Sequence, residues 1–353
     1  MLLNLQRPLA IPTQVVKANS FASTTRKAIK RGRPFQPPAN LRCLLAGSGS
    51  DMMNEEVVAN TVLSMLPTSP SKKHLQSVKV VYVGTASYDL NGPRQRQTEQ
   101  FLKLGCVVKS LNVALSPLTP DDQILVNTAD VLIFSGGNTL YAMDRWRLLG
   151  LDDLFRQAME RGVVLTGGSA GAVCWFQGAH SDSMDPKTWK GAMLSTFSKT
   201  GDESSEAPKD EDSAEAWPYI RIQGLGVLPG LVCPHHDKVQ SNGSLRATDF
   251  DSMLLRYPNE VGICMDHFSA LKIVGDSFRV LSLPDKDGSV LPNGDFSNDR
   301  KGRPGIWMKW VHNGKVRRRL CPSSGKLSEL LLETTEVHTD PREEACRLQN
   351  PAQ

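Results

Sequence analysis

The chain has 353 residues, of which 40% are hydrophobic and 22% are charged, a composition typical of a globular protein with a sizeable core. This composition excludes a wholly disordered chain, a collagen-like repeat and a disulfide scaffold. No apolar run approaches the roughly 18 residues that a membrane span requires, so we expect no membrane partner.

The formal net charge of +4 has its source in the N-terminal segment. Residues 1–50 contain no Asp or Glu, and seven Lys and Arg residues precede Pro37, so the remaining body is mildly acidic. A basic start that contains Ser and Thr is typical of an organelle transit peptide. We therefore expect residues 1–38 to be a disordered leader addressed to a plastid (chloroplast), with the mitochondrion or cytoplasm as alternatives. Because the basicity is confined to this leader, no nucleic-acid partner is expected.

Strands and helices alternate along the body of the chain. Apolar runs predict strands at 41–46, 78–84, 129–134 and 162–166, and helical spacing predicts helices at 51–66, 93–104, 139–147 and 151–160. This order is typical of an α/β domain with a mostly parallel sheet and helices on both faces. In such sheets, binding and catalytic groups gather at the carboxyl ends of the strands.

The predicted α/β domain spans residues 39–320 and contains an acidic insertion at about 201–216, which we expect to be flexible. Strands are expected at 231–233 and 261–265, a helix at 248–256, and a hairpin that joins 270–274 to 279–283. Residues 321–353 form a C-terminal extension with a polar tail. The seven cysteines are scattered without a CxxC pair, which favours buried reduced thiols and indicates neither a metal site nor disulfides.

The strongest chemical signal is the segment Gly167-Gly168-Ser169-Ala170-Gly171, directly after the predicted strand 162–166. The spacing Gly-x-Ser-x-Gly between a strand and an apolar segment is typical of a nucleophile elbow. A strained turn there presents the serine hydroxyl near free backbone amides, which favour developing negative charge. We expect Ser169 to be a nucleophile, and a Gly-rich turn or phosphate cradle is the alternative.

A serine nucleophile needs a base, and His235 and His236 follow the apolar run 231–233. A neutral imidazole can accept the serine proton and return it to the leaving amine. We select His235, with His236 as the alternative.

An imidazole base is usually oriented by a carboxylate. Asp266 ends the predicted strand 261–265 and is our candidate, with Asp182 as its competitor. Two backbone amides are needed to bind the oxyanion. The amide of Ala170 follows the nucleophile, and Gly136 or Gly137, after the strand 129–134, can supply the second.

Three segments together are distinctive: SGGNT at 135–139, GGSAGAVCWF at 167–176 and LPGLVCPHHD at 228–237. They resemble peptidase family S51, which contains aspartyl dipeptidases (peptidase E) and cyanophycinases, and the resemblance runs from about residue 41 to about residue 285. It implies a flavodoxin-like fold similar to that of the class I glutamine amidotransferases. It also implies Ser169 as nucleophile, His235 as base, and Gly136 and Ala170 as amide donors, with no metal or organic cofactor.

One departure from the family pattern concerns the triad acid, for which the family often has a glutamate in the loop after the late strand. This chain reads Cys264-Met265-Asp266-His267-Phe268, so His267 appears where the glutamate would fall. We therefore take the neighbouring Asp266 as the candidate for the triad acid. Because the glutamate is absent, a catalytically weakened binding protein with the same fold is an alternative to an active peptidase.

The resemblance implies a small peptide or isopeptide that bears aspartate as the substrate. An arginine fork binds a carboxylate well, and Arg246 is our candidate for that role. Asn138 is a second candidate for substrate binding. A cyanophycinase-like exopeptidase, and an esterase of the α/β-hydrolase type with a late base such as His312, are the other enzyme hypotheses. A homodimer is left open.

Overall fold

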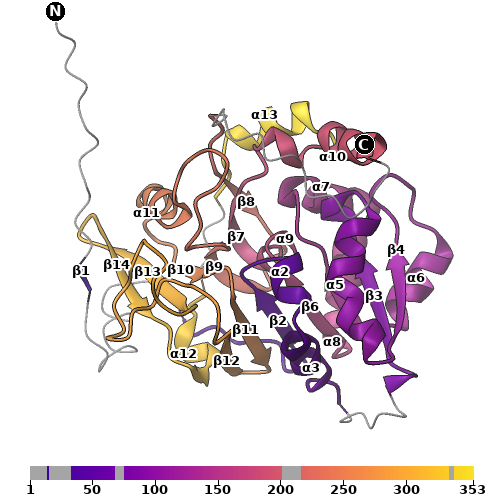
Figure 1. The fold of residues 1–353 in the computed structure, drawn as a ribbon, viewed down its shortest axis with the longest axis horizontal. Helices are drawn as coiled ribbons and strands as arrows, with labels where there is room; N and C mark the ends of the chain where they lie inside the picture. Colours follow the sequence, from indigo (N-terminus) through magenta and orange to yellow (C-terminus); the bar gives the residue numbers. More distant parts are fainter. Residues whose placement is uncertain (1–13, 16–32, 68–74, 201–215, 334–337) are drawn as a thin grey trace, which may run out of the picture.

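The computed structural model describes residues 14–15, 33–67, 75–200, 216–333 and 338–353. Most of the predicted leader and nearly all of the predicted acidic insertion lie outside these residues. The strands form two sheets, and helices flank both of them (Figure 1).

Five parallel strands form the centre of the larger sheet, in the spatial order β2-β6-β5-β3-β4. Their bounds are β2 (Arg42–Ala46), β3 (Lys79–Val83), β4 (Val107–Leu111), β5 (Val131–Phe134) and β6 (Val164–Gly168). Three strands extend the sheet antiparallel beside β2, namely β11 (Ser269–Val274), β12 (Ser277–Ser282) and β15 (Ser324–Lys326). The predicted hairpin is therefore confirmed as β11 and β12.

Successive residues of the central strands enter two different cores. Cys43 and Leu45 of β2 pack into one cluster, whereas Leu44 and Ala46 pack into another. A strand that is buried on both faces must be apolar at nearly every position, which explains the continuous apolar runs in the sequence.

Helices supply the other half of each core. One face is covered by α3 (Glu56–Leu63) and α5 (Asn91–Lys103), and the opposite face by α6 (Pro120–Asn127), α7 (Thr139–Leu149) and α8 (Leu151–Glu160). The helix expected at 51–66 is divided, because Glu55 is extended and separates α2 (Ser50–Met53) from α3. Two short 3₁₀ turns, η1 (Thr85–Ser87) and η2 (Pro186–Thr188), also occur in loops.

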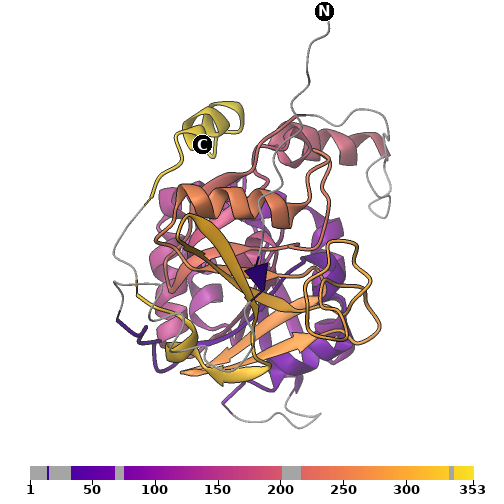
Figure 2. The same cartoon turned by 90° about the vertical axis from the view of Figure 1, so that its left-hand side faces the viewer.

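The smaller sheet has the order β1-β14-β13-β10-β9-β7-β8. Its parallel centre is β7 (Phe176–Ser181), β9 (Leu228–Cys233) and β10 (Gly262–Met265), and it is flanked by β8 (Ile220–Gln223), β13 (Ile306–His312), β14 (Lys315–Leu320) and the two-residue β1 (Gln14–Val15). The helix α11 (Arg246–Arg256) lies across the β13–β14 hairpin (Figure 2). Neither β13 nor β14 was expected from the sequence.

The C-terminal extension contains two helices, α12 (Leu327–Leu330) and α13 (Arg342–Gln349). The helix α13 packs near α7 and α10 (Lys190–Thr200) at one edge of the molecule (Figure 1). It is held by Arg347, which binds Asp144, and by the thiol of Cys346, which donates to the carbonyl of Ser183.

The predicted α/β class is confirmed, with antiparallel strands added to a parallel centre. All seven cysteines are free and buried, as their scattered spacing indicates. Among the described residues, no helix is both long and apolar enough to cross a bilayer.

The carboxyl ends of β2, β5 and β6 meet so closely that only glycine fits between them. A methyl group added at Gly168 would lie 1.7 Å from the carbonyl oxygen of Ser48. One added at Gly171 would lie 1.9 Å from the carbonyl oxygen of Phe134. Three loops are therefore fixed against one another by main-chain contact, without side chains between them.

We expect Gly171→Ala to destabilise the protein by about 1–3 kcal/mol, because backbone atoms on both sides must move to admit the methyl group. The matched control is Gly191→Ala in α10, where an added methyl group meets nothing within 4 Å and helix propensity favours alanine. Urea unfolding measures both changes. Equal stability of the two variants would contradict the close contact at Gly171.

Candidate active site

Ser169 lies at the tight turn between β6 and α9 (Ala170–Val173), with φ 52° and ψ −121°. Positive φ is costly for a non-glycine residue, by about 1–3 kcal/mol, and such strain is concentrated at functional sites. The turn is held because the amide of Ser169 donates to the carbonyl of Ala46 over 3.1 Å, while its carbonyl accepts from Ala172 and Val173. The geometry is that of the predicted elbow, although α9 is only four residues long before the chain enters β7.

Gly136 and Ala170, the residues whose amides are the predicted oxyanion donors, both lie next to Ser169. A methyl group added at Gly136 would be 3.5 Å from the Cβ of Ser169. Ala170 is the first residue of α9, where the amide has no carbonyl one turn earlier to which it could donate. Gly137 has φ 127°, and an added methyl group there would lie 2.2 Å from the carbonyl oxygen of Ala86. The loop after β5 thus requires glycine to reach this position.

His235 follows β9 and also has a left-handed backbone, with φ 48°. Its amide donates to the carbonyl of Gly47 over 3.1 Å. Ser169 and His235 therefore bind consecutive carbonyls, those of Ala46 and Gly47, at the end of β2. This shared anchor brings the two main chains to one point at the carboxyl edge of the sheet.

The His235 ring takes part in a chain of hydrogen bonds that the sequence analysis missed. Its Nδ1 lies 2.8 Å from Nδ1 of His267, and Nε2 of His267 lies 2.7 Å from Oδ2 of Asp51. Burial of the ring, together with the nearby charges of Arg246 and Lys238, lowers the pKa of His235 well below its usual value. The hydrogen bond from His267 lowers the pKa of Asp51 as well. The His235 ring is thus neutral at pH 7, and Asp51 is ionised.

His267 and Asp51 both follow strand ends, which is the signal that could have assigned them this role. His267 comes two residues after β10, and Asp51 lies in α2, five residues after β2. Polar residues in these positions meet at the same edge of a sheet.

Asp266, the predicted triad acid, requires a correction. Its Oδ1 lies 3.3 Å from Nδ1 of His236, and its Oδ2 accepts from the amides of Ser289 and Gly305 and from the Ser289 hydroxyl. Among the described residues, no hydrogen bond joins Asp266 to His235. The side chain is completely buried, which raises its pKa to about 6, and it fastens two loops to the end of β10. Since successive residues at a strand end point in different directions, adjacency to His267 did not bring Asp266 to the same ring.

Arg246, the predicted carboxylate-binding residue, is buried within the protein. Its guanidinium donates to Asp182 over 3.0 Å and to the ring and carbonyl of His180, and it lies over the Tyr219 ring. Asp182, the competing triad acid, is therefore paired with Arg246. The two side chains bind each other within the protein, so Arg246 does not take up the predicted carboxylate-binding role and Asp182 does not take up that of triad acid.

Asn138 is likewise committed to the fold. Its Oδ1 accepts from the amide of Tyr141 and caps α7, and its Nδ2 donates to Thr188 and to the carbonyl of Ser183. The side chain is completely buried, and both of its polar atoms bind protein groups. It therefore stabilises the glycine loop and does not take up the predicted role in substrate binding.

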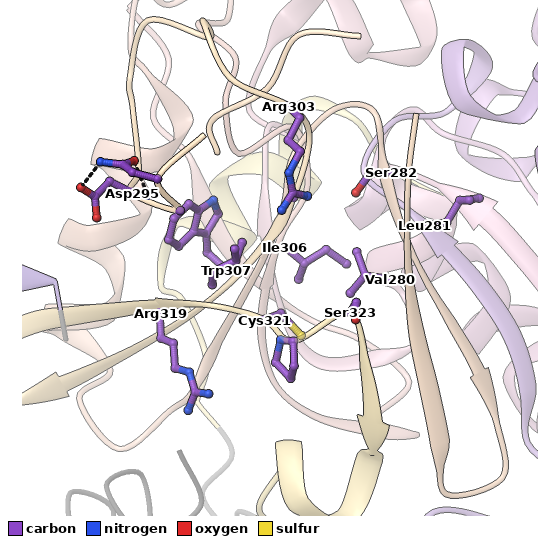
Figure 3. A pocket seen from close by; sticks show the side chains of 15 residues that line it. Val280, Leu281, Ser282, Asp295, Arg303, Ile306, Trp307, Arg319, Cys321 and Ser323 are labelled. Carbon is purple, nitrogen blue, oxygen red and sulfur yellow. Dashed lines mark hydrogen bonds between the residues drawn. The ribbon is translucent and has the colours of Figure 1, made fainter. Parts of the chain in front are cut away.

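A cavity of about 780 Å³ lies elsewhere, between β12 and the β13–β14 hairpin. Its wall includes Val280, Ile306, Trp307 and Cys321, with Arg303 extending towards it (Figure 3). Neither Ser169 nor His235 lines this cavity. In the part of the chain that the structure describes, no group of three or more His, Cys, Asp or Glu side chains is arranged to hold a metal ion.

Comparison with known proteins gives two relatives with 30% identity or more. The chain is 30% identical to G2/mitotic-specific cyclin-1 of Trypanosoma brucei brucei over 321 residues, which cover 86% of this chain and 92% of that protein. It is 31% identical over 159 residues to the uncharacterized peptidase YgaJ of Bacillus subtilis (strain 168), which cover 45% of this chain and 55% of that protein.

Two solved structures are also similar, each with a TM-score of 0.47. One is a putative peptidase E protein from Listeria monocytogenes EGD-e, at 15% identity over 69% of this chain and 98% of that chain. The other is a peptidase from an acI-B1 Actinobacterium, at 18% identity over 83% of this chain and 99% of that chain.

The family comparison agrees with the sequence segments on which the resemblance was based. The model of peptidase family S51 matches residues 44–281, which include both the Ser169 elbow and the His235 loop. The chain belongs to peptidase family S51.

Proposed function

We propose that the chain is a serine peptidase in which Ser169 attacks an amide bond and His235 transfers the proton. The observation that supports this most strongly is the strained elbow at Ser169, whose main chain shares an anchor at the end of β2 with that of His235. The lowered pKa of His235 supports the assignment as well, because a base must be unprotonated to accept the serine proton.

The proposed reaction has two halves. As the Ser169 oxygen bonds to the substrate carbonyl carbon, its proton moves to His235, and the amides of Gly136 and Ala170 bind the oxyanion. The intermediate collapses, the C–N bond breaks, and His235 returns the proton to the leaving amine. Water then hydrolyses the acyl-enzyme by the same steps, which restores the free serine.

The substrate in this proposal is a small peptide or isopeptide that contains aspartate, as the family resemblance implies. Because Arg246 is buried with internal partners, another cation must attract the substrate carboxylate. Lys238 is half-buried, and its charge acts on both His235 and Asp51. We therefore assign carboxylate attraction to Lys238.

We expect Ser169→Ala to abolish covalent labelling by a fluorophosphonate probe and to abolish dipeptide hydrolysis, because the attacking oxygen is removed. Intact-mass spectrometry of the labelled protein measures the first result directly. The control is Ser195→Ala, an exposed hydroxyl in α10. Labelling of Ser169→Ala at the rate of the parent would show that the nucleophile is a different residue.

We expect Lys238→Ala to raise KM for acidic dipeptides by about tenfold while kcat changes little, because a charge-assisted contact is lost from ground state and transition state alike. The assay compares α-Asp dipeptides, β-Asp-Arg and matched Asn dipeptides, which also separates the dipeptidase from the cyanophycinase-like hypothesis. Lys315→Ala, an exposed lysine on β14, is the control. An unchanged preference for Asp over Asn in Lys238→Ala would reject this role.

A further inference from the structure

The chain of hydrogen bonds that starts at His235 ends at the carboxylate of Asp51, and His267 lies between the two residues. We propose that His267 and Asp51 together replace the single orienting acid, with His267 as the group that fixes the protonation of His235 and Asp51 as the group that fixes His267. Both are positioning residues. This inference rests on the proposed function, since it concerns the base of that reaction.

The tautomers of the His267 and His235 rings can be assigned by starting from Asp51. Asp51 is ionised and can only accept, so Nε2 of His267 is the donor in the 2.7 Å bond. In a neutral imidazole the other nitrogen is then an acceptor, so the Nδ1–H group of His235 donates a hydrogen bond to Nδ1 of His267 over 2.8 Å. Nε2 of His235 is left unprotonated. That nitrogen is the one required to accept the Ser169 proton.

The position of His267 is itself fixed by buried groups. Its amide donates to Oδ1 of Asp237 over 2.7 Å, and the other carboxylate oxygen of Asp237 is bound by Arg300. The His267 ring packs against Phe268 with a centroid separation of 4.5 Å. A ring held in this way can present its Nδ1 to His235 without loss of rotamer freedom during the reaction.

A second proton on His267 would reverse the arrangement. Both nitrogens of the ring would then donate, so Nδ1 of His235 would have to accept, and its only proton would move to Nε2, the side needed for catalysis. The charged groups around this pair are Asp51, Asp237, Lys238 and Arg246, with Arg96 also acting on Asp51. We therefore expect labelling to slow on acidification, because a second proton on the His267 ring would place the His235 proton on the wrong nitrogen.

The test uses the rate of fluorophosphonate labelling of the full chain from about pH 4.5 to about pH 8, because phosphonylation also needs His235 to accept the Ser169 proton. We expect His267→Ala to label about 10²-fold more slowly near neutral pH. His267→Asn keeps an acceptor near the position of Nδ1 but cannot gain a proton. We expect it to label within about tenfold of the parent rate and to move the acidic fall to lower pH.

Asp51→Asn should slow labelling less than His267→Ala does, because the Asp51 side chain is 61% exposed and its charge is screened by water. The matched control is Asp153→Asn, an exposed acid in the first turn of α8, which should label at the parent rate.

Three outcomes separate the possibilities. If Ser169→Ala abolishes labelling but His267→Ala labels at the parent rate with the parent pH profile, the proposal for His267 and Asp51 is overturned and the nucleophile stands. If Ser169→Ala labels normally, the proposed function itself fails. If His267→Ala does not fold, the His267→Asn profile decides, and an acidic fall at the parent pH overturns the proposal.

Discussion

The carbonyls of Ala46 and Gly47, at the end of one central strand, are the anchor on which the site depends. One accepts from the amide of Ser169 and the other from the amide of His235. Each of these residues has a positive φ, so each turn stores strain that the anchoring bonds must offset. Because β2 is buried on both faces, the anchor cannot shift without disturbing two cores at once.

Sequence and structure agree best where the fold imposes a strong steric requirement. The tight turn at Ser169 could be predicted because glycines at fixed spacing around a serine are typical of a nucleophile elbow, and the structure shows that a methyl group at Gly168 or Gly171 would collide with the main chain. The central strands could be predicted because burial on both faces requires continuous apolar residues. The strand β14 could not, since its Lys and Arg residues interrupt that pattern, whereas β13 carries an apolar run that was overlooked.

The partners of polar side chains were much harder to predict, because hydrogen bonding depends on direction as well as on position. Asp266 and His267 are neighbours in the chain, yet one faces His236 and the other faces His235. Arg246 shows the same limit: an arginine near the site is available to substrate only if the fold leaves it without an acid, and Asp182 already binds it. Asp51 was missed because 216 residues separate it from His267 in the sequence.

The packing of α13 has a practical consequence for how the protein is handled. The side chain of Asn350 donates to the Tyr88 hydroxyl and accepts from the amide of Lys190, and Tyr88 in turn donates to the carbonyl of Thr188. Thr188 also receives a hydrogen bond from Asn138, at the base of the glycine loop. An affinity tag or a truncation that pulls α13 away would therefore loosen the glycine loop from a distance.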